Sequence, residues 1–191
     1  MSRMLHYLQW LAFTLSATLL SYCAVCLVDA RLFQRDAGLE FDYRRSAEVS
    51  AIPPSTSANV STSGLIGRLG IPRLGVSVIV VEGTSNSVLR RAAGHISGTG
   101  LPGRPGNIGI SAHRDTFFRP LRNIRSDDLI TFTTLTGEYR YRVVSTRIVS
   151  PDNVAVLAPD GGEILTVVTC YPFYFVGSAP DRFIVRAERI L

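Results

Sequence analysis

The sequence predicts a mostly β domain that closes into a barrel with a few short helices, preceded by one N-terminal transmembrane helix. The barrel is predicted because residues 65–191 hold many short β-rich segments separated by Gly, Pro, Asn and Asp, with few helical patterns between them. The anchor is predicted because residues 5–28 contain no Asp, Glu, Lys or Arg. We therefore expect an anchor over residues 1–28, a juxtamembrane segment and stalk over 29–64, and one compact domain over 65–191.

The uncharged run from Leu5 to Val28 has 24 residues, and about 20 apolar residues suffice to cross a bilayer. A cleaved signal peptide is the alternative, but its apolar region usually has about 7 to 15 residues before a small-residue cleavage site. The greater length favours an uncleaved anchor. Its orientation stays open by charge counting, because Arg3 flanks one end and Arg31 and Arg35, offset by acidic residues, flank the other.

Three further features of the N-terminal third bear on its organisation. Cys23 and Cys26 have C-x-x-C spacing, but they lie inside the apolar run, where small apolar side chains on one helical face are the simpler interpretation. A short juxtamembrane helix is expected within 29–44. The Ser- and Thr-rich stretch 46–63, with Pro53 and Pro54, is expected to be a flexible stalk.

Seven segments of the domain are expected to be strands because β-branched and aromatic residues alternate in them between turn signals. They are LIGRLGI (65–71), VSVIVV (76–81), NIGISAH (107–113), LITFTT (129–134), EYRYRVVSTRIV (138–149), EILTVVTC (163–170) and RFIVRAERI (182–190). Helical turns are expected only in SNSVLRRAAG (85–94), TFFRPLRNI (116–124) and DNVAVL (152–157).

Composition removes several function classes. All 20 basic residues are arginine, so chemistry that needs a lysine nucleophile, Schiff base or phosphate-loop lysine is excluded. The net charge of +5 is spread over single and paired arginines without a basic run or zinc-finger spacing, so we expect no nucleic-acid partner. Cys170 is the one cysteine of the domain, so no disulfide can form within it.

Three residues that could carry chemistry are expected away from the core faces of their strands. Alternation places His113 opposite Ile110 and Ala112, and it places Arg182 opposite the apolar set of its own strand. Cys170 ends a strand. A thiolate can be a nucleophile, an imidazole can carry a proton, and a guanidinium can hold a developing oxyanion. Sequence spacing alone does not show that the three meet, and an inert thiol, a satisfied histidine and a surface charge remain the alternatives.

Three motifs then resemble those of the sortases, membrane-anchored cysteine transpeptidases of bacterial surfaces. LTVVTC, ending at Cys170, resembles the TLxTC motif, SAHRDTFFRPL resembles the segment of the catalytic histidine, and APDRFIVRA places Arg182 twelve residues after the cysteine. The resemblance extends from GRLGIPRLGVSVIVVEG to the C-terminus, and CYPFYFVGSAP is most similar to class D sortases.

The resemblance implies an eight-stranded barrel, catalytic residues Cys170, His113 and Arg182, and a substrate-positioning Thr169. It implies cleavage of an LPxTG-like sorting signal near the C-terminus of exported proteins, through a thioester, with transfer to an amine of a cell-wall peptide or pilin lysine. It also implies a single-pass plasma-membrane protein with its domain on the extracytoplasmic side.

His95 lies in a Gly- and Pro-rich stretch and is expected to have a substrate-groove or structural role rather than a catalytic one. Asp127 and Asp128 are too few oxygen ligands for a calcium site, so we expect no metal and no cofactor.

Two alternative classes stay open. One is a different thiol acyl-transfer enzyme, a cysteine protease or an L,D-transpeptidase. The other is a non-catalytic scaffold with a sortase-like barrel.

Overall fold

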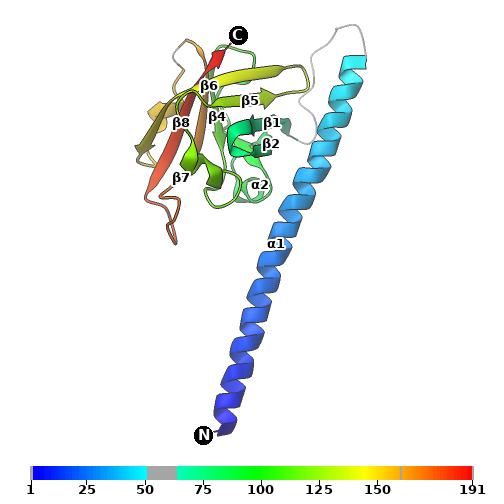
Figure 1. The fold of residues 1–191 in the computed structure, drawn as a ribbon, viewed down its shortest axis with the longest axis vertical. Helices are drawn as coiled ribbons and strands as arrows, with labels where there is room; N and C mark the ends of the chain where they lie inside the picture. Colours follow the sequence, from blue (N-terminus) through cyan, green and yellow to red (C-terminus); the bar gives the residue numbers. More distant parts are fainter. Residues whose placement is uncertain (1, 51–63, 160, 191) are drawn as a thin grey trace.

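A computed structural model describes residues 2–50, 64–159 and 161–190. One long helix, α1 (Ser2–Ser50), runs beside a β domain that lies against the C-terminal half of that helix (Figure 1). The anchor helix and the expected juxtamembrane helix are therefore one continuous element. The helix also extends five residues into the expected stalk, whose remaining residues up to Ser63 lie outside the described part of the chain.

The domain is a closed barrel of eight strands, which confirms the predicted fold class. Around the barrel the order is β1-β2-β3-β4-β7-β8-β6-β5. The pairs β2–β3 and β4–β7 are parallel and the other pairs are antiparallel. The strands are β1 (Leu65–Ile71), β2 (Val76–Glu82), β3 (Ala93–His95), β4 (Gly106–Ser111), β5 (Leu129–Thr133), β6 (Glu138–Val149), β7 (Glu163–Tyr171) and β8 (Asp181–Ile190).

Short helical turns join the strands where the sequence indicated them. They are α2 (Asn86–Leu89), η2 (Arg119–Asn123) and η3 (Val154–Leu157). The structure adds η1 (Pro72–Leu74) and the strand β3, which the sequence did not indicate. Three residues are too few to show the alternation that identifies a strand. Gly94 is required in β3 because a Cβ there would lie 2.2 Å from the carbonyl oxygen of Gly83.

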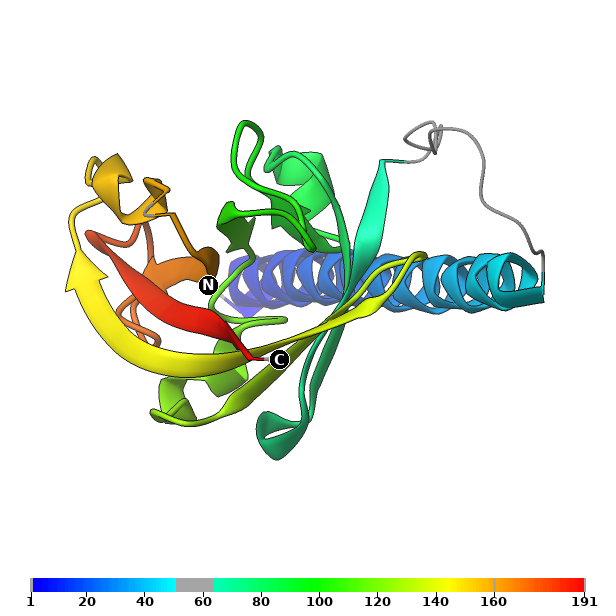
Figure 2. The same cartoon turned by 90° about the horizontal axis from the view of Figure 1, so that it is seen from above.

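Alternation along the strands fills the barrel interior with apolar side chains. On β4, Ile108 and Ile110 are fully buried, and Val185 and Ala187 of β8 belong to the same core cluster. This confirms the predicted core faces of both strands. Seen from above, the barrel wall curves around this core while α1 passes outside it (Figure 2).

The outer face of β2 is buried as well, because α1 covers it. Phe41 is 0% exposed and packs with Ile79, Val81 and Ala92. Strand β3 pairs with β2 only over Val80–Glu82, which leaves the N–H of Ile79 to donate to Gln34 Oε1 at 2.9 Å. The continuous apolar run VIVV is thus explained by burial of β2 on both sides.

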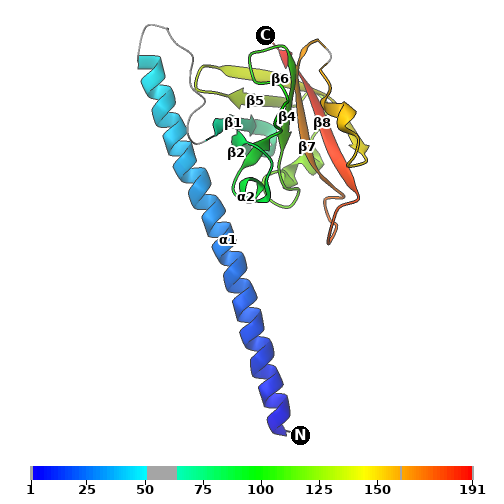
Figure 3. The same cartoon turned by 180° about the vertical axis from the view of Figure 1, so that it is seen from behind.

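Polar contacts extend this interface along α1. Gln34 Nε2 donates to the Arg91 carbonyl at 2.8 Å, and Arg91 Nε lies 2.7 Å from Asp29 Oδ2. The Arg68 guanidinium pairs with Asp42 at 3.0 Å. Figure 3 shows the same arrangement from behind, with the N-terminal half of α1 projecting beyond the barrel. Within the described residues, α1 is the one helix long and apolar enough to cross a bilayer, and none of its most apolar stretch is buried.

Candidate active site

The three residues predicted to be catalytic come from three adjacent parts of the barrel wall. Strands β4, β7 and β8 are neighbours in the sheet. On β7 the side chains of Leu165, Val167 and Thr169 are buried, so Cys170 lies on the opposite, outer face. The same alternation places Arg182 on the outer face of β8, and His113 lines a cleft between the barrel and α1. The three side chains therefore share one side of the wall.

The register brings His113 level with Cys170. Strand β4 pairs with β7 in parallel up to Ser111 opposite Val168, and the Ala112 N–H continues the ladder by donating to the Val168 carbonyl at 3.3 Å. His113 is the next residue, so it stands opposite the end of β7. The prediction placed it inside the strand, whereas the structure places it two residues beyond the end of β4. Both Cys170 and His113 are partly exposed, so both side chains can be reached from solvent.

Arg182 lies on the other side of the cysteine. Cys170 and Arg182 are Cα partners in the antiparallel β7–β8 ladder, where facing residues are neighbours on one surface of the sheet. The Arg182 guanidinium Nη1 donates to the carbonyls of Ala179 and Asp181, at 3.3 and 3.0 Å. These bonds hold the side chain beside the strand end and leave other N–H groups of the guanidinium for an acceptor.

Thr169 links the two segments that carry the cysteine and the histidine. Its side chain is 1% exposed, and its hydroxyl donates to the Ala112 carbonyl at 2.8 Å. Ala112 directly precedes His113, and Thr169 directly precedes Cys170. The hydroxyl thus fixes the spacing of His113 and Cys170 from inside the barrel.

An aromatic cluster supports the strand ends next to Cys170. Phe173 packs edge-on against Phe183 with ring centroids 5.3 Å apart, and Tyr171 lies 6.1 Å from Phe173 and 6.3 Å from Phe183. Phe183 faces Thr169 across the β7–β8 ladder. Phe173 and Phe183 also pack against the barrel core, so the cluster holds the strand end that carries Cys170.

His95 lies apart from these residues, on β3 rather than in a loop. It is 3% exposed, and both ring nitrogens have partners: Glu82 Oε2 at 2.7 Å from Nδ1, and the Gly100 carbonyl and Thr99 hydroxyl at 2.9 and 3.0 Å from Nε2. Of the two expected roles, these contacts account for the structural one. Desolvation raises the pKa of Glu82, but hydrogen bonds from Ser97 and His95 offset this effect and leave that pKa below its usual value.

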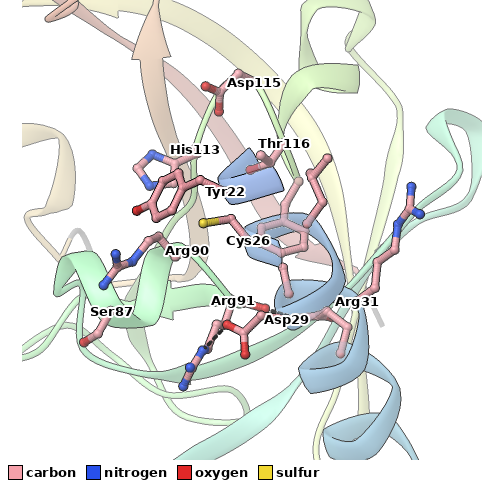
Figure 4. Close-up of a pocket in the computed structure, with 14 residues that line it drawn as sticks. Tyr22, Cys26, Asp29, Arg31, Ser87, Arg90, Arg91, His113, Asp115 and Thr116 are labelled. Carbon is pink, nitrogen blue, oxygen red and sulfur yellow. Dashed lines mark hydrogen bonds and ion pairs between the residues drawn. The ribbon is translucent and has the colours of Figure 1, made fainter. Parts of the chain in front are cut away.

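A cleft of about 890 Å³ separates α1 from the barrel, and His113 lines it. Figure 4 shows Tyr22 and Cys26 on the helix side, facing His113 and Thr116 on the barrel side. The Asp29–Arg91 ion pair lies at one end of the cleft. The sequence did not indicate that residues of the apolar run would lie beside His113, because contacts between distant segments leave no local pattern.

Arg114 is a second residue that sequence reasoning missed. Its guanidinium Nη2 donates to the carbonyls of Phe175 and Gly177, at 2.7 and 3.0 Å, and lies over the Phe175 ring. It therefore holds the loop between β7 and β8 against the His113 segment. Its position directly after His113 in SAHRDTFFRPL was the available signal.

Asp127 and Asp128, the two acidic residues considered for calcium, are not arranged as a calcium site. Asp128 is buried and accepts two hydrogen bonds from the Arg73 guanidinium, while Asp127 precedes it in a left-handed turn with φ 69°. The hydrogen bonds from Arg73 and the Arg125 N–H lower the pKa of Asp128 below its usual value, despite the opposing effect of burial. Among the described residues, no group of three or more His, Cys, Asp or Glu side chains is placed to hold a metal ion.

Comparison with known proteins agrees with this geometry. The family model for the sortase domain matches residues 69–190, which is more than half of the chain. Sortase D of Bacillus subtilis is 35% identical over 125 residues, covering 65% of this chain and 63% of that protein. Sortase A of Bacillus anthracis is 22% identical over 138 residues, covering 70% of this chain and 64% of that protein. The chain thus spans a little under two thirds of the length of these relatives.

Solved structures show the same barrel. A Sortase D5 transpeptidase of Clostridium perfringens superposes with a TM-score of 0.66 at 25% identity, covering 86% of this chain and 99% of that one. Sortase C1 of Streptococcus suis gives a TM-score of 0.63 at 27% identity, covering 68% of this chain and 74% of that one. The expected resemblance to sortases, class D among them, is confirmed, and this chain belongs to the sortase family.

Proposed function

We propose that this protein is a membrane-anchored cysteine transpeptidase that cleaves an LPxTG-like sorting signal of exported proteins and transfers the acyl group to an amine. The observation that supports this most directly is the register: His113, Cys170 and Arg182 share the outer side of three adjacent segments of the barrel wall. Membership of the sortase family supports the reaction class.

In the first step the Cys170 thiolate attacks the carbonyl carbon of the scissile peptide bond. The Arg182 guanidinium donates hydrogen bonds to the oxygen on which negative charge develops. The C–N bond then breaks, His113 gives its proton to the departing amine, and a thioester on Cys170 remains.

In the second step an amine attacks the thioester carbonyl and His113 accepts the proton that the amine loses. The C–S bond breaks, the Cys170 thiolate is restored, and the product carries a new amide bond. Thr169 acts as a positioning residue, because its bond to the Ala112 carbonyl sets the spacing of the two reactive side chains.

The membrane anchor belongs to the same proposal. The long apolar helix α1 fits a single span, with the barrel on the extracytoplasmic side, where exported substrates and cell-wall or pilin amines are available. Protease accessibility in intact cells tests the orientation, because an extracytoplasmic barrel is digested by an added protease and a cytoplasmic barrel is protected.

Intact-mass analysis of the full chain in detergent micelles tests the reaction. The protein is incubated with LPxTG- and LPxTA-like peptides, with and without triglycine as the amine. We expect an adduct on the wild type and on the control Cys26→Ser, none on Cys170→Ala, and conversion of the adduct to a triglycine-linked peptide. Release of free acid even at high triglycine would indicate a cysteine protease instead. A Cys170 thiol that forms no adduct would support a non-catalytic scaffold.

A further inference from the structure

The tip of the β7–β8 loop exposes three apolar side chains to solvent. Tyr174, Phe175 and Val176 have 75%, 44% and 98% of their surfaces exposed. Such a run at the end of a loop is unusual in a soluble domain, which hides its large apolar groups or groups them at an interaction site.

Two arginines flank this tip. Arg122 lies over the Tyr174 ring with its Cζ 5.4 Å from the ring centroid, and Arg114 lies over Phe175 at 5.8 Å. From Arg114 to Arg125 the chain has four arginines against one acid, Asp115. Aromatic and apolar side chains flanked by arginine are the composition that binds the interface of an anionic lipid bilayer.

The packing of α1 on the barrel fixes which side of the domain faces the membrane. The uncharged run ends at Val28, and the next residue, Asp29, pairs with Arg91 just after α2. Residues 113 and 115–117 line the cleft together with Tyr22 and Cys26, which belong to the uncharged run. The His113 segment therefore lies level with the C-terminal end of the proposed span, the end nearest the barrel.

The loop tip lies on the same side. Arg114 belongs to the His113 segment and holds the loop through the carbonyls of Phe175 and Gly177. In both side views the loop between β7 and β8 is the part of the barrel that reaches furthest toward the N-terminal end of α1 (Figures 1 and 3).

From these observations we infer that the β7–β8 loop tip, residues 174–176, inserts into the headgroup region of the bilayer that α1 spans, and that Arg119 and Arg122 bind anionic headgroups beside it. This inference rests on the proposed membrane anchoring by α1. The barrel is then held at the membrane at two points, the helix and the loop, with Cys170 and Arg182 at the base of the loop.

Tryptophan fluorescence in nanodiscs of phosphatidylcholine and phosphatidylglycerol tests the inference with the full chain. The protein has one tryptophan, Trp10, within the proposed span. A Trp10→Phe, Val176→Trp variant moves the probe to the loop tip, and a Trp10→Phe, Thr136→Trp variant places it in the exposed β5–β6 turn as a matched control. Lipids brominated on their acyl chains quench a tryptophan that contacts them.

We expect brominated lipids to lower the emission of the Val176→Trp probe at least about two-fold, because interfacial side chains reach about 5–10 Å into the boundary region. The Thr136→Trp probe should stay unquenched. Equal emission of the two probes would overturn the inference. So would a loop probe that responds only to added LPxTG-like peptide, since the loop would then bind substrate rather than lipid.

The charge component has its own control. Arg119→Glu with Arg122→Glu should reduce quenching of the loop probe in anionic nanodiscs, whereas Arg142→Glu with Arg147→Glu, on the exposed side of β6, should not. If neither double substitution changes the quenching of the loop probe, the proposed role of Arg119 and Arg122 is wrong.

Native Trp10 reports on the anchor, and an unquenched Trp10 would overturn the anchoring and this inference together. None of these readings needs turnover. An inactive protein with a quenched loop probe would therefore contradict the proposed reaction and leave the membrane contact supported.

Discussion

Cys170 and Arg182 face each other as register partners across β7 and β8, and the Arg182 guanidinium is held by two carbonyls of its own chain. This relationship gives a first prediction. Arg182→Lys should lower kcat/KM by about 10²–10³-fold, because lysine lacks the planar fork that donates to a developing oxyanion. Steady-state kinetics with the cleaved peptide measures it, and Arg142→Lys on exposed β6 is the control. Full activity of Arg182→Lys would contradict the assigned role.

The two histidines of the domain should respond oppositely to substitution. His113→Ala should abolish formation of the acyl-enzyme with little change in Tm, because His113 is partly exposed. His95→Ala should lower stability by about 1–3 kcal/mol, because it leaves buried partners without a hydrogen bond. It should retain activity per folded molecule. Thermal melts and intact-mass assays on both variants test these expectations. Loss of acylation in His95→Ala but not in His113→Ala would show that His95, and not His113, is the histidine that acylation needs.

Thr169 should act through position rather than contact. Thr169→Val keeps the shape of the side chain and removes the bond to the Ala112 carbonyl, so we expect a loss of about 1–3 kcal/mol in stability and a lower kcat. Thr169→Ser retains the hydroxyl and should recover most of kcat. Equal kcat values for the two variants would indicate that the hydroxyl does not set the geometry of the site.

The Arg73–Asp128 pair should contribute to acid sensitivity. Since the folded-state pKa of Asp128 lies below its usual value of about 3.9, the pair stabilises the protein above that pH and loses its contribution as pH falls through the lowered folded pKa. Asp128→Asn should therefore lower Tm at pH 7 and weaken the decline of Tm as the pH falls below about 4. The exposed Asp152→Asn is the control. An unchanged acid decline in Asp128→Asn would contradict the prediction.

Docking of α1 on the barrel should depend on Phe41. Phe41 is fully buried against β2, whereas Tyr43, two residues on, is 74% exposed. Phe41→Ala removes a buried ring, a change that costs about 3–5 kcal/mol in a core. Hydrogen exchange should then rise in β2 around Ile79 and stay at the wild-type rate in Tyr43→Ala. Unaltered exchange in Phe41→Ala would show that the helix is held by other contacts.

The sequence predicted the parts of this fold that carry local patterns. The segments 65–71 and 138–149 were predicted with the observed bounds of β1 and β6, because alternation and turn residues mark both ends. Ala93–His95 was missed because three residues show no period. The three catalytic candidates came from motif resemblance and strand faces, and their common side of the wall depends on the order β4-β7-β8, which local patterns do not encode.

The contact of α1 with the barrel was beyond sequence reasoning for a similar reason. Gln34 completes the hydrogen bonding of Ile79 on β2, and this need arises only because β3 is too short to reach it. The apolar run VIVV indicates burial on both faces of β2, but it does not indicate which segment packs on the outer face.

Helix α1 is unbroken from the apolar run to Gln34 and Phe41, so it fixes the distance along its axis between the apolar run and the contacts with the barrel. Gln34 lies six residues after Val28, a rise of about 9 Å along the helix axis. In a membrane-spanning α1, the packing of the helix on the barrel fixes the height of Cys170 relative to the lipid. Each inserted residue would lift the barrel by about 1.5 Å and turn it by about 100°. A substrate must then display its scissile bond at one fixed height, so the length of its own membrane-proximal segment becomes a selection criterion.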